Sequence, residues 1–543
     1  MRADPEEASE ALPAACAVYT ICGAVLTCFI VALPRSVLWA ERFALPKEVA
    51  LHASALVCAL LGFRHSRRFR VDVLDAAVCL FALLGMLSAL LVAENKWAAW
   101  RGAFLTTSAV LLFISSRAIN GRWRRRHQPL LVEGLAWTLT ALAATSLLEA
   151  YGVVEGLSAL GRAPGGTLGN RNRTAHLMVL GLPVLWASLM HASNRRRTFL
   201  ILCCTSSVSA VLILSHSRAA WLATLIMTGC AIIARAWMYF RVRVRRRTLG
   251  FACATVMGGV LAVAIPNALR WRSEVGYLTT LQRIGEYNAG SGHGRVIQYA
   301  NTLRMAVDHP LLGVGPGNWS LHYLRYADGR DPSAGSTGLV PVDRLPQSDW
   351  LGFAAERGYP AVVLLAFTGS LLLAGSWATA RTAKLSGERD RAFALAMGLL
   401  ALLVLGALDV VLLTPAGVCF VAVLTGALAP PRTGRRISLP RTARWSCNLL
   451  IIAVTTVPLV QGTLRIRAAN LAGNWYDPWP NADKLTRAVA LDPGSFEARV
   501  LLARALIQAG RCDQAMLQLH VAERLFPDAP SVARLREACL EPA

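Results

Sequence analysis

The chain has 543 residues, of which 55% are hydrophobic and only 16% are Asp, Glu, Lys or Arg, and its mean hydropathy is +0.45. Soluble domains carry about 25% charged residues, so much of the surface is expected to face lipid, and a disordered chain, a collagen-like chain and a small disulfide scaffold are excluded. The formal net charge of +24 fits either a nucleic acid or a membrane surface as partner, and the positions of the basic residues decide between them.

Apolar runs long enough to cross a membrane recur along the chain. A helix needs roughly 20 apolar residues to span about 30 Å of hydrocarbon, and we count about thirteen such runs, separated by short basic clusters. The predicted fold is therefore all-α, a polytopic helical bundle in a membrane. The predicted spans are residues 12–33, 47–63, 73–92, 97–116, 129–151, 174–192, 198–214, 219–240, 249–266, 356–376, 391–412, 415–429 and 445–463.

Basic residues gather in every second connection between these runs. Lys and Arg are retained on the cytoplasmic side during insertion, so these connections and the N-terminal tail, residues 1–11, are predicted to face the cytoplasm. The acidic start of the chain, with no small-residue cleavage site, predicts no cleaved signal peptide. No basic stripe is interleaved with aromatic residues, so a nucleic acid is not an expected partner. The basic clusters are residues 64–70, 117–126, 195–197, 241–247, 381–391 and 432–444.

The 13 cysteines do not form a metal-binding or disulfide pattern. Eleven of them lie in or beside apolar runs, and there is no Cys-x-x-Cys pair. We interpret them as small buried hydrophobic residues. Only Cys512 and Cys539 lie in a soluble region.

Two long segments are predicted on the outer side of the membrane. An odd number of crossings places the C-terminal segment, residues 464–543, opposite the N-terminus. The connection 267–350 is also on this outer side, and a loop of that length is usually functional. The sequence therefore predicts a transmembrane domain at 12–463 with this outer loop, followed by a separate extracytoplasmic domain.

The C-terminal segment contains a repeat. The interval from Ala488 to Ala522 equals the interval from Pro493 to Pro527, and it matches the tetratricopeptide period of about 34 residues. About one and a half units fit, too few for a long solenoid, so we predict that this tail packs on another surface or binds a protein partner. A plain helical hairpin domain is the alternative. The predicted helices are residues 482–490, 495–509, 512–525 and 530–538.

Two carboxylates in the apolar runs keep a transporter as an alternative. A polytopic bundle is most often a transporter or channel, and such proteins carry charged residues at mid-membrane. Glu149 ends the fifth run and Asp409 interrupts the eleventh. Each is equally well explained as a buried carboxylate with a partner, and no internal inverted repeat is visible.

Four polar motifs are predicted to converge on the outer side of the membrane. Because they meet on one face, we expect a site at the outer leaflet. Arg218 by itself is also compatible with a side chain that extends from a helix end toward lipid headgroups. The motifs are Gly169-Asn170-Arg171-Asn172, Ser215-His216-Ser217-Arg218, Gly294-Arg295 and Pro346-Gln347-Ser348-Asp349-Trp350.

In their full form, these motifs resemble the O-antigen ligase and O-antigen polymerase family. The order, the spacing and the predicted membrane side agree over about residues 160–425, and the similarity extends to the tetratricopeptide tail that some members carry. The similarity rests on Gly169-Asn170-Arg171-Asn172 with Ala175, Ser215-His216-Ser217-Arg218-Ala219-Ala220-Trp221, Gly294-Arg295, Asp308-His309-Pro310-Leu311-Leu312-Gly313-Val314-Gly315-Pro316-Gly317-Asn318, and Asp349-Trp350-Leu351 with Ala355-Glu356-Arg357-Gly358.

The resemblance implies a glycosyltransferase of the bacterial inner membrane. Such enzymes take a glycan from an undecaprenyl-diphosphate carrier and transfer it, with inversion and without a metal or other cofactor, to a hydroxyl group. The implied acceptor is another glycan, the lipid A core or a protein. The other expected partners are membrane lipids and a protein bound by the tail.

Arg218 and Arg295 match the two functional arginines of that family, and we predict catalytic roles for both. A departing lipid diphosphate needs positive charge where its negative charge develops. Arginine supplies this charge on a planar fork that stays protonated and that binds phosphate oxygens through two hydrogen bonds.

The remaining motif residues are predicted to bind substrate. The glycine-rich segment allows close backbone approach to a ligand, and free N–H groups there would form an anion nest; a tight turn that braces the loop explains it equally well. The two asparagines suit sugar hydroxyls or, alternatively, a helix N-cap. The predicted substrate-binding residues are Asn170, Asn172, Ser215, Ser217, Gly313, Gly315, Gly317, Asn318, Asp349 and Glu356.

Gln347 departs from the family pattern, although we place it in the catalytic set by position. Members usually carry a histidine there, proposed as the base that accepts the proton of the acceptor hydroxyl, and glutamine cannot accept that proton. General-base assistance is typically worth about 10²- to 10⁴-fold, so slower chemistry, a recruited base and an inactive member are the alternatives. The candidates for a recruited base are His293, His309, His322 and Glu356.

The sequence thus predicts an O-antigen ligase-type glycosyltransferase. A polymerase of the same family, which differs in its acceptor, is the first alternative. A polysaccharide or lipid transporter and a catalytically silent scaffold that recruits partners through its tail are alternatives from other classes.

Overall fold

The computed structural model describes residues 5–34, 41–65, 68–118, 124–159, 161–238, 246–269, 276–282, 290–327, 331, 345–432, 434, 436–438, 440–473 and 480–540. Within these residues the fold is α-helical, as predicted, with twenty α-helices, one short 3-10 helix and two strands of three residues each. Parts of the N-terminal tail, of the basic clusters 64–70, 117–126, 241–247 and 432–444, and of the connection 267–350 lie outside the described residues.

Each predicted apolar run corresponds to one helix. These helices are α1 (Pro5–Ile30), α2 (Leu45–His65), α3 (Val73–Leu91), α4 (Lys96–Ala118), α5 (Arg124–Ala150), α6 (Arg171–Met190), α7 (Arg195–Leu214), α8 (Arg218–Met238), α9 (Arg246–Ala264), α13 (Asp349–Thr382), α14 (Ser386–Leu408), α15 (Pro415–Leu428) and α16 (Arg441–Ala472). Within the described residues, ten are long and apolar enough to cross a membrane, and α15 and Cys16–Ile30 of α1 are shorter apolar helices. The remaining one, α2, buries Lys47, Glu48 and His52.

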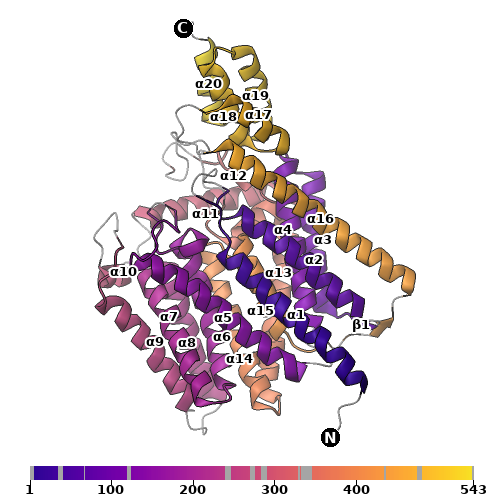
Figure 1. The fold of residues 1–543 in the computed structure, drawn as a ribbon, viewed down its shortest axis with the longest axis vertical. Helices are drawn as coiled ribbons and strands as arrows, with labels where there is room; N and C mark the ends of the chain where they lie inside the picture. The colour runs from indigo at the N-terminus through magenta and orange to yellow at the C-terminus, as the bar shows by residue number, and fades with distance from the viewer. Residues whose placement is uncertain are drawn as a thin grey trace.

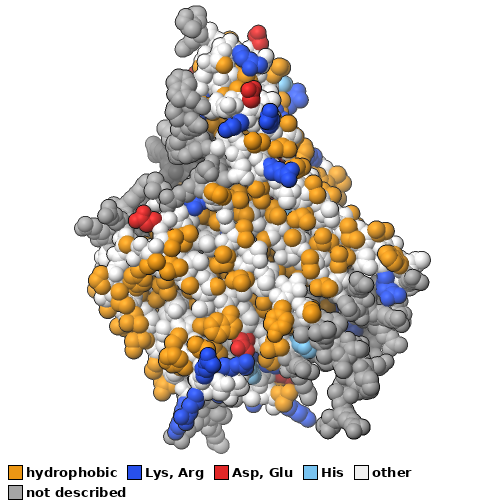
Figure 2. All heavy atoms as spheres, in the orientation of Figure 1, with side chains coloured by type: hydrophobic (Ala, Val, Ile, Leu, Met, Phe, Trp, Pro, Cys, Tyr) orange, Lys and Arg blue, Asp and Glu red, His pale blue; other side chains and the backbone are white. Residues whose placement is uncertain are grey.

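The long axis of the molecule separates the two ends of the chain. Figure 1 shows the helical bundle with the C-terminal tail projecting from one end, while α1 begins at the other end. On the face drawn in Figure 2, hydrophobic side chains cover the bundle, and Lys and Arg gather at its lower edge and on the tail. An apolar belt between two polar ends is the surface expected of a protein that spans a bilayer.

Helix α6 lies at the centre of the bundle. Of the residues in its apolar window, 94% are buried, against 17% in α9 and 22% in α13. It contacts α5, α7, α8 and α14. A helix that is apolar on all sides is stable only when other helices enclose it, so α6 gives the residues at its N-terminal end a rigid base.

The connection 267–350 contains three helices that the sequence analysis did not predict, α10 (Tyr277–Gln282), α11 (Gly290–Asp308) and α12 (Trp319–Tyr323). Helix α11 buries the polar side chains of Gln298 and Asn301, whereas Val296 is 44% and Val307 59% exposed. Its polar side therefore faces the protein and its apolar side faces outward. Figure 1 shows α11 at the end of the bundle that carries the tail. This arrangement fits a helix at a membrane surface, with its apolar side toward lipid.

Helix α13 is divided in two at Gly358. This glycine has φ 78° and ψ 171°, which are not helical angles, and Pro360 follows it. A Cβ atom at Gly358 would lie 2.3 Å from the carbonyl oxygen of Leu311, and the N–H of Tyr359 donates to the carbonyl of Pro310 at 2.8 Å. The break therefore lets the segment before α12 pack directly on the helix backbone.

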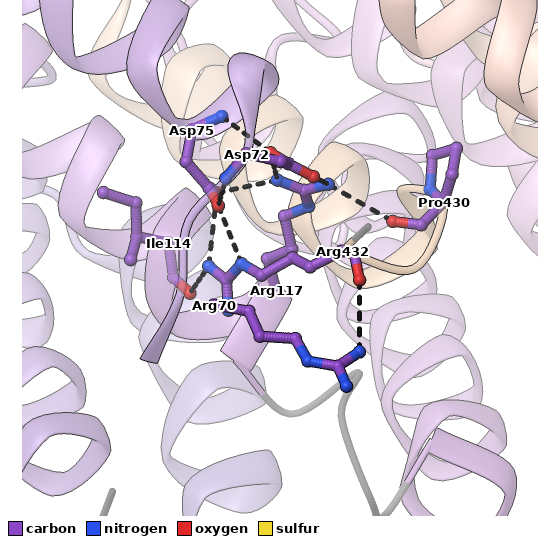
Figure 3. A network of polar contacts seen from close by, with 7 residues as sticks. All are labelled: Arg70, Asp72, Asp75, Ile114, Arg117, Pro430 and Arg432. Atoms are coloured by element: carbon purple, nitrogen blue, oxygen red, sulfur yellow. Dashed lines mark hydrogen bonds and ion pairs between the residues drawn. The ribbon is translucent and has the colours of Figure 1, made fainter. Parts of the chain in front are cut away.

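A charge network of buried and half-buried side chains links three segments of the bundle (Figure 3). Arg117 of α4 donates to both carboxylate oxygens of Asp72, at 2.7 and 2.6 Å, and pairs with Asp75 at 2.7 Å. Arg432 also pairs with Asp75, at 2.8 Å. Both acidic residues form the capping box of α3, so the network joins α3, α4 and the connection between α15 and α16.

Two short strands link this connection to the one between α2 and α3. Strand β1 (Arg68–Arg70) pairs antiparallel with β2 (Arg436–Ser438), with Phe69 opposite Ile437. Arg70 donates to the carbonyl of Arg432 at 3.5 Å. Segments of two predicted basic clusters, 64–70 and 432–444, thus pair through their backbones.

The tail has the four predicted helices, α17 (Ala482–Leu491), α18 (Phe496–Gln508), α19 (Cys512–Leu525) and α20 (Pro530–Leu540). Its hydrophobic core continues into the end of α16, through Ala468, Ala469 and Ala472, and into α12 through Leu321. The predicted domain boundary at 463/464 therefore falls inside α16, because this helix extends beyond its apolar part to carry the tail.

Candidate functional site

Arg295 is held by an ion pair at the end of α14. Its guanidinium donates to the carbonyl of Leu408 at 2.9 Å and to Oδ2 of Asp409 at 3.0 Å. Leu408 is the last residue of α14 and Asp409 its C-cap. Carbonyl groups at a helix C-terminus attract positive charge, so both the helix end and the carboxylate fix the position of Arg295.

The segment that follows Asp409 is held from its other side by Asp349. The Asp349 carboxylate accepts hydrogen bonds from the N–H groups of Val411, Leu412 and Leu413, at 2.8 to 3.1 Å. Successive N–H groups that converge on one anion form a nest. Asp349, predicted to bind substrate, thus positions the backbone next to Asp409.

Gln347 lies beside the helix that carries Arg295. Its backbone N–H donates to Oε1 of Gln298 at 2.7 Å, and Gln298 is on α11, one turn after Arg295. Ser348 is the N-cap of α13, and its hydroxyl donates to the carbonyl of Gly406 at 2.9 Å. Two of the predicted catalytic residues, Arg295 and Gln347, are therefore brought together at one end of the bundle.

His176 of α6 lies on the other side of Asp409. Its Nε2 is 3.8 Å from Asp409 Oδ2, the same oxygen that pairs with Arg295. The carboxylate of Asp409 therefore lies between an imidazole and a guanidinium.

A small pocket, partly open to solvent, lies next to this bridge. Arg173 and His176 line it from α6, and Lys47 lines it from α2. The Lys47 ammonium group donates to the carbonyl of Thr167 at 2.9 Å and to that of Val31. The pocket thus combines basic groups with apolar walls. The other lining residues are Phe43, Ala44, Leu168, Leu177, Val410, Val411, Thr414, Pro415, Ala416 and Gly417.

The Arg218 motif lies against α10. Ser215 caps the end of α7, where its hydroxyl donates to the carbonyl of Leu212 at 2.7 Å and accepts the N–H of Ser217 at 3.3 Å. His216 has φ 49° and stacks on Tyr277 with ring centroids 4.3 Å apart. Arg218, half-buried, begins α8, which contacts both α6 and α14.

The environment of His216 keeps its ring neutral. Burial, and then the charge of Arg171, lower its pKa to about 4. Its Nδ1 lies 3.0 Å from the hydroxyl of Thr280. His216 therefore acts as an uncharged spacer between the Arg218 turn and α10 at neutral pH.

The glycine-rich segment forms a second cluster with the first part of α13. Gly313, Gly315 and Gly317 have φ of 65°, 101° and 70°. Gly315 donates to the backbone carbonyl of Glu356 at 3.0 Å, and the buried Glu356 carboxyl group accepts from the N–H groups of Gly317 and Trp319. The nest thus already holds a carboxylate of the same chain, and the tight-turn interpretation accounts for these contacts.

The two asparagines near α6 and the carboxylate of Glu149 have local partners. Asn170 is the N-cap of α6, and its side chain accepts a hydrogen bond from the N–H of Asn172 at 2.9 Å. This contact agrees with the helix-cap alternative for the two asparagines. Glu149 accepts hydrogen bonds from Ser158 and from the N–H of Gly166 at 2.9 Å. Glu149 and Asp409 are thus both buried carboxylates with partners.

The histidines considered as a recruited base lie elsewhere. His322 is 3.7 Å from Glu94, and burial, despite the charge of Glu94, lowers its pKa to about 4. His309 meets His322 edge to face with ring centroids 6.0 Å apart, and His293 is exposed. By contrast, the sequence analysis did not single out His176, since a lone histidine in an apolar helix carries no local signal.

The fold is that of a multi-pass helical membrane protein, with an arginine-containing polar cluster at the end of the bundle that carries the tail. Residues 199–366 match the family model described as O-antigen ligase, and residues 482–539 match that of a tetratricopeptide repeat. The resemblance found in the sequence is thereby confirmed: the chain carries an O-antigen ligase family domain, of the ligase or polymerase type, and a tetratricopeptide tail. The chain has no match among curated proteins.

Proposed function

We propose that the protein transfers a glycan from an undecaprenyl-diphosphate carrier to an acceptor hydroxyl group, in the manner of an O-antigen ligase. The observation that carries this proposal is the position of Arg295. It is fixed by Asp409 and the end of α14, and it lies beside Gln347 and near a basic pocket.

Arg295 suits a role at a departing diphosphate. Its side chain is 23% exposed and is anchored to Leu408 and Asp409, so it is both partly accessible and held in place. Anchoring reduces the reorganisation needed when negative charge develops on the leaving group. We assign Arg218, which begins a neighbouring helix, to the same diphosphate, and Gln347 to the orientation of the acceptor.

The proposed site faces the outer side of the membrane. Helices α11, which carries Arg295, and α12 lie at the end of the bundle with the tail, and strand β1, which contains Arg70 of the charge network, lies nearer the other end (Figure 1). Basic clusters mark the cytoplasmic end, which supports an extracytoplasmic site and tail.

A transporter receives less support from the structure. Coupling carboxylates in transporters exchange protons or ions during the cycle. Here Glu149 is held by Ser158 and Gly166, and Asp409 by Arg295. Both contacts fit fixed structural roles.

The test is deletion of the gene, followed by analysis of surface polysaccharide and of lipid-linked glycan. Complete glycan chains trapped on the carrier support a ligase, whereas short units that still reach the acceptor support a polymerase. Normal polysaccharide together with a normal lipid-linked pool would contradict both, and impaired flux of an untransferred lipid would favour the transporter.

A further inference from the structure

His176 is a buried histidine whose ring makes no well-aligned hydrogen bond to the residues that the structure describes. Its exposed fraction is 1%, and neither ring nitrogen has a well-aligned partner; the ring makes only a poorly aligned contact with the backbone of Val410. Buried polar groups are normally hydrogen-bonded, and each exception calls for an explanation. Because the ring also lines the pocket beside Asp409, a role toward a ligand in that pocket is a direct explanation.

The neighbours of His176 resemble the surroundings of a general base. Asp409 Oδ2 is 3.8 Å from Nε2, and Arg295 holds that carboxylate in place at 3.0 Å. A fixed carboxylate beside an imidazole orients the ring and stabilises the imidazolium that forms when the ring takes a proton. The same carboxylate thus connects the imidazole to the arginine assigned to the leaving group.

We propose that His176 accepts the proton of the acceptor hydroxyl, with Asp409 as its positioning carboxylate. This inference rests on the proposed glycosyl transfer and deepens it. It supplies the base that position 347 lacks, because Gln347 can orient a hydroxyl group but cannot take its proton. The pocket next to His176 is then the place where the acceptor hydroxyl enters.

In the proposed step, the acceptor oxygen forms a bond to the anomeric carbon of the donor glycan. At the same time the proton of the acceptor hydroxyl passes to a ring nitrogen of His176. The bond between the anomeric carbon and the diphosphate oxygen breaks, and its electron pair leaves with the lipid diphosphate. The imidazolium then returns its proton to solvent or to the departing diphosphate.

The charges around His176 link proton uptake to the presence of the donor. Arg295 pairs with Asp409 beside the ring, and Arg173 and Lys47 line the same pocket as His176. A bound diphosphate offsets the positive charges, so the imidazolium becomes more favourable when the donor is in place. The base is therefore strongest in the complex that reacts.

The test uses the full-length purified protein in phospholipid vesicles, with an undecaprenyl-diphosphate-linked glycan as donor and the acceptor defined by the gene deletion. His176→Gln should lower kcat by about 10²- to 10⁴-fold, the usual size of general-base assistance, while the donor KM stays within about twofold. His191→Gln, the same substitution at the other end of α6, is the matched control and should retain wild-type kcat.

Rescue separates a chemical role from a structural one. In a His176→Gln background, Gln347→His places an imidazole on the other side of Arg295, and we expect at least a tenfold recovery of kcat, because one proton acceptor replaces another. A merely structural His176 would not be rescued by a residue on the N-terminal loop of α13.

The outcomes distinguish this inference from the proposed function. A wild-type protein that consumes no donor overturns the proposed transfer itself. An active wild type with unchanged kcat in His176→Gln overturns the role of His176 alone. If His176→Gln does not accumulate, Asp409→Asn is the deciding variant. Loss of the carboxylate should move the acidic limb of the pH profile of kcat to lower pH. An acidic limb that does not move overturns the proposal.

Discussion

Asn95 and Asn318 hold each other through two hydrogen bonds. The backbone N–H of Asn95 donates to Oδ1 of Asn318 at 2.9 Å, and Nδ2 of Asn318 donates to the Asn95 carbonyl at 3.2 Å. The side chain of Asn95 also donates to the carbonyl of Leu525 in α19, at 3.0 Å. One residue between α3 and α4 thus joins the glycine-rich segment to the tail.

Asn95→Ala is expected to loosen the tail without unfolding the bundle. The substitution leaves the Leu525 carbonyl unpaired, at a cost of about 1–3 kcal/mol. Limited proteolysis should then release the tail several times faster than in the wild type. Gln514→Ala, which removes only a contact with Arg511 within the tail, should leave the rate unchanged. Equal rates in both variants would show that Asn95 does not secure the tail.

Arg295→Lys and Arg218→Lys should each lower transfer at least tenfold while the protein still inserts. Lysine keeps the charge but loses the fork that binds two phosphate oxygens. Arg304→Lys is a control on the same helix as Arg295, because Arg304 contacts Asn301 rather than the proposed site. Wild-type polysaccharide in both lysine variants would contradict the diphosphate role and favour contacts with lipid headgroups.

Gln347→His should preserve or raise activity, and Gln347→Ala should reduce it less than Arg295→Ala does. A neutral imidazole at this position can take a proton, whereas the amide only orients the hydroxyl. The measurement is the initial rate of glycan transfer by each variant at matched expression. The opposite ranking, with Gln347→His inactive, would mean that the amide makes a contact for which histidine is no substitute.

Arg117→Met should destabilise the bundle by at most about 3–5 kcal/mol, because Asp72 loses its ionic partner and Asp75 keeps only Arg432. Asp72 and Asp75 face Arg117, whose side chain is 2% exposed. We expect a lower Tm in detergent solution. Adding Asp72→Asn should recover part of the loss, and a Tm that falls further in the double variant would contradict this explanation.

The effect of Arg117→Met should depend little on pH near neutrality. Burial would raise the pKa of Asp72, but the hydrogen bond from Arg117 outweighs it and lowers this pKa below 3.8. A lowered folded-state pKa stabilises the fold above the unfolded value, and this contribution is lost only as the pH falls through the folded value. The difference in Tm between wild type and variant should therefore be constant between roughly pH 5 and 8.

Reporter fusions should place the outer loop and the C-terminus on the same, extracytoplasmic side. The reason is the alternation of basic connections together with an odd number of crossings. Fusions within 332–340, which lie outside the described residues, and after Ala543 should be active with a reporter that works only outside the cytoplasm. A fusion at 384, between α13 and α14, is the control and should be inactive. Activity of the first two fusions only in the cytoplasm would reverse the topology.

The helices could be predicted because their signals are local. The apolar runs and the repeat at the tetratricopeptide period indicate where helices form, and the four tail helices closely match their predicted ranges. The orientation of α11, with its polar side toward the protein, could not be predicted from local signals. Its polar residues indicate a loop, because their burial depends on α13 and α14, which are distant in sequence.

The candidate site could be predicted only in part, for a related reason. Arg295 and Gln347 carry recognisable motifs, so the sequence identifies both, and the structure places them together. The pairing of His176 with Asp409 joins α6 to the end of α14, which lies far later in the chain. Neither residue has a motif, and only the packed bundle brings them into contact.

Because the apolar side of α11 is exposed, contacts with lipid help to set the depth of the candidate site in the bilayer. With Val296 and Val307 toward the acyl chains, α11 is proposed to rest at the boundary between headgroups and hydrocarbon. In a thicker or thinner bilayer that boundary moves, and a mismatch costs fractions of a kcal/mol per Å. Arg295 is on the same helix but is anchored to the end of α14, so such a movement would strain its contacts with Leu408 and Asp409. The local thickness of the membrane thus becomes a variable that acts on the catalytic geometry.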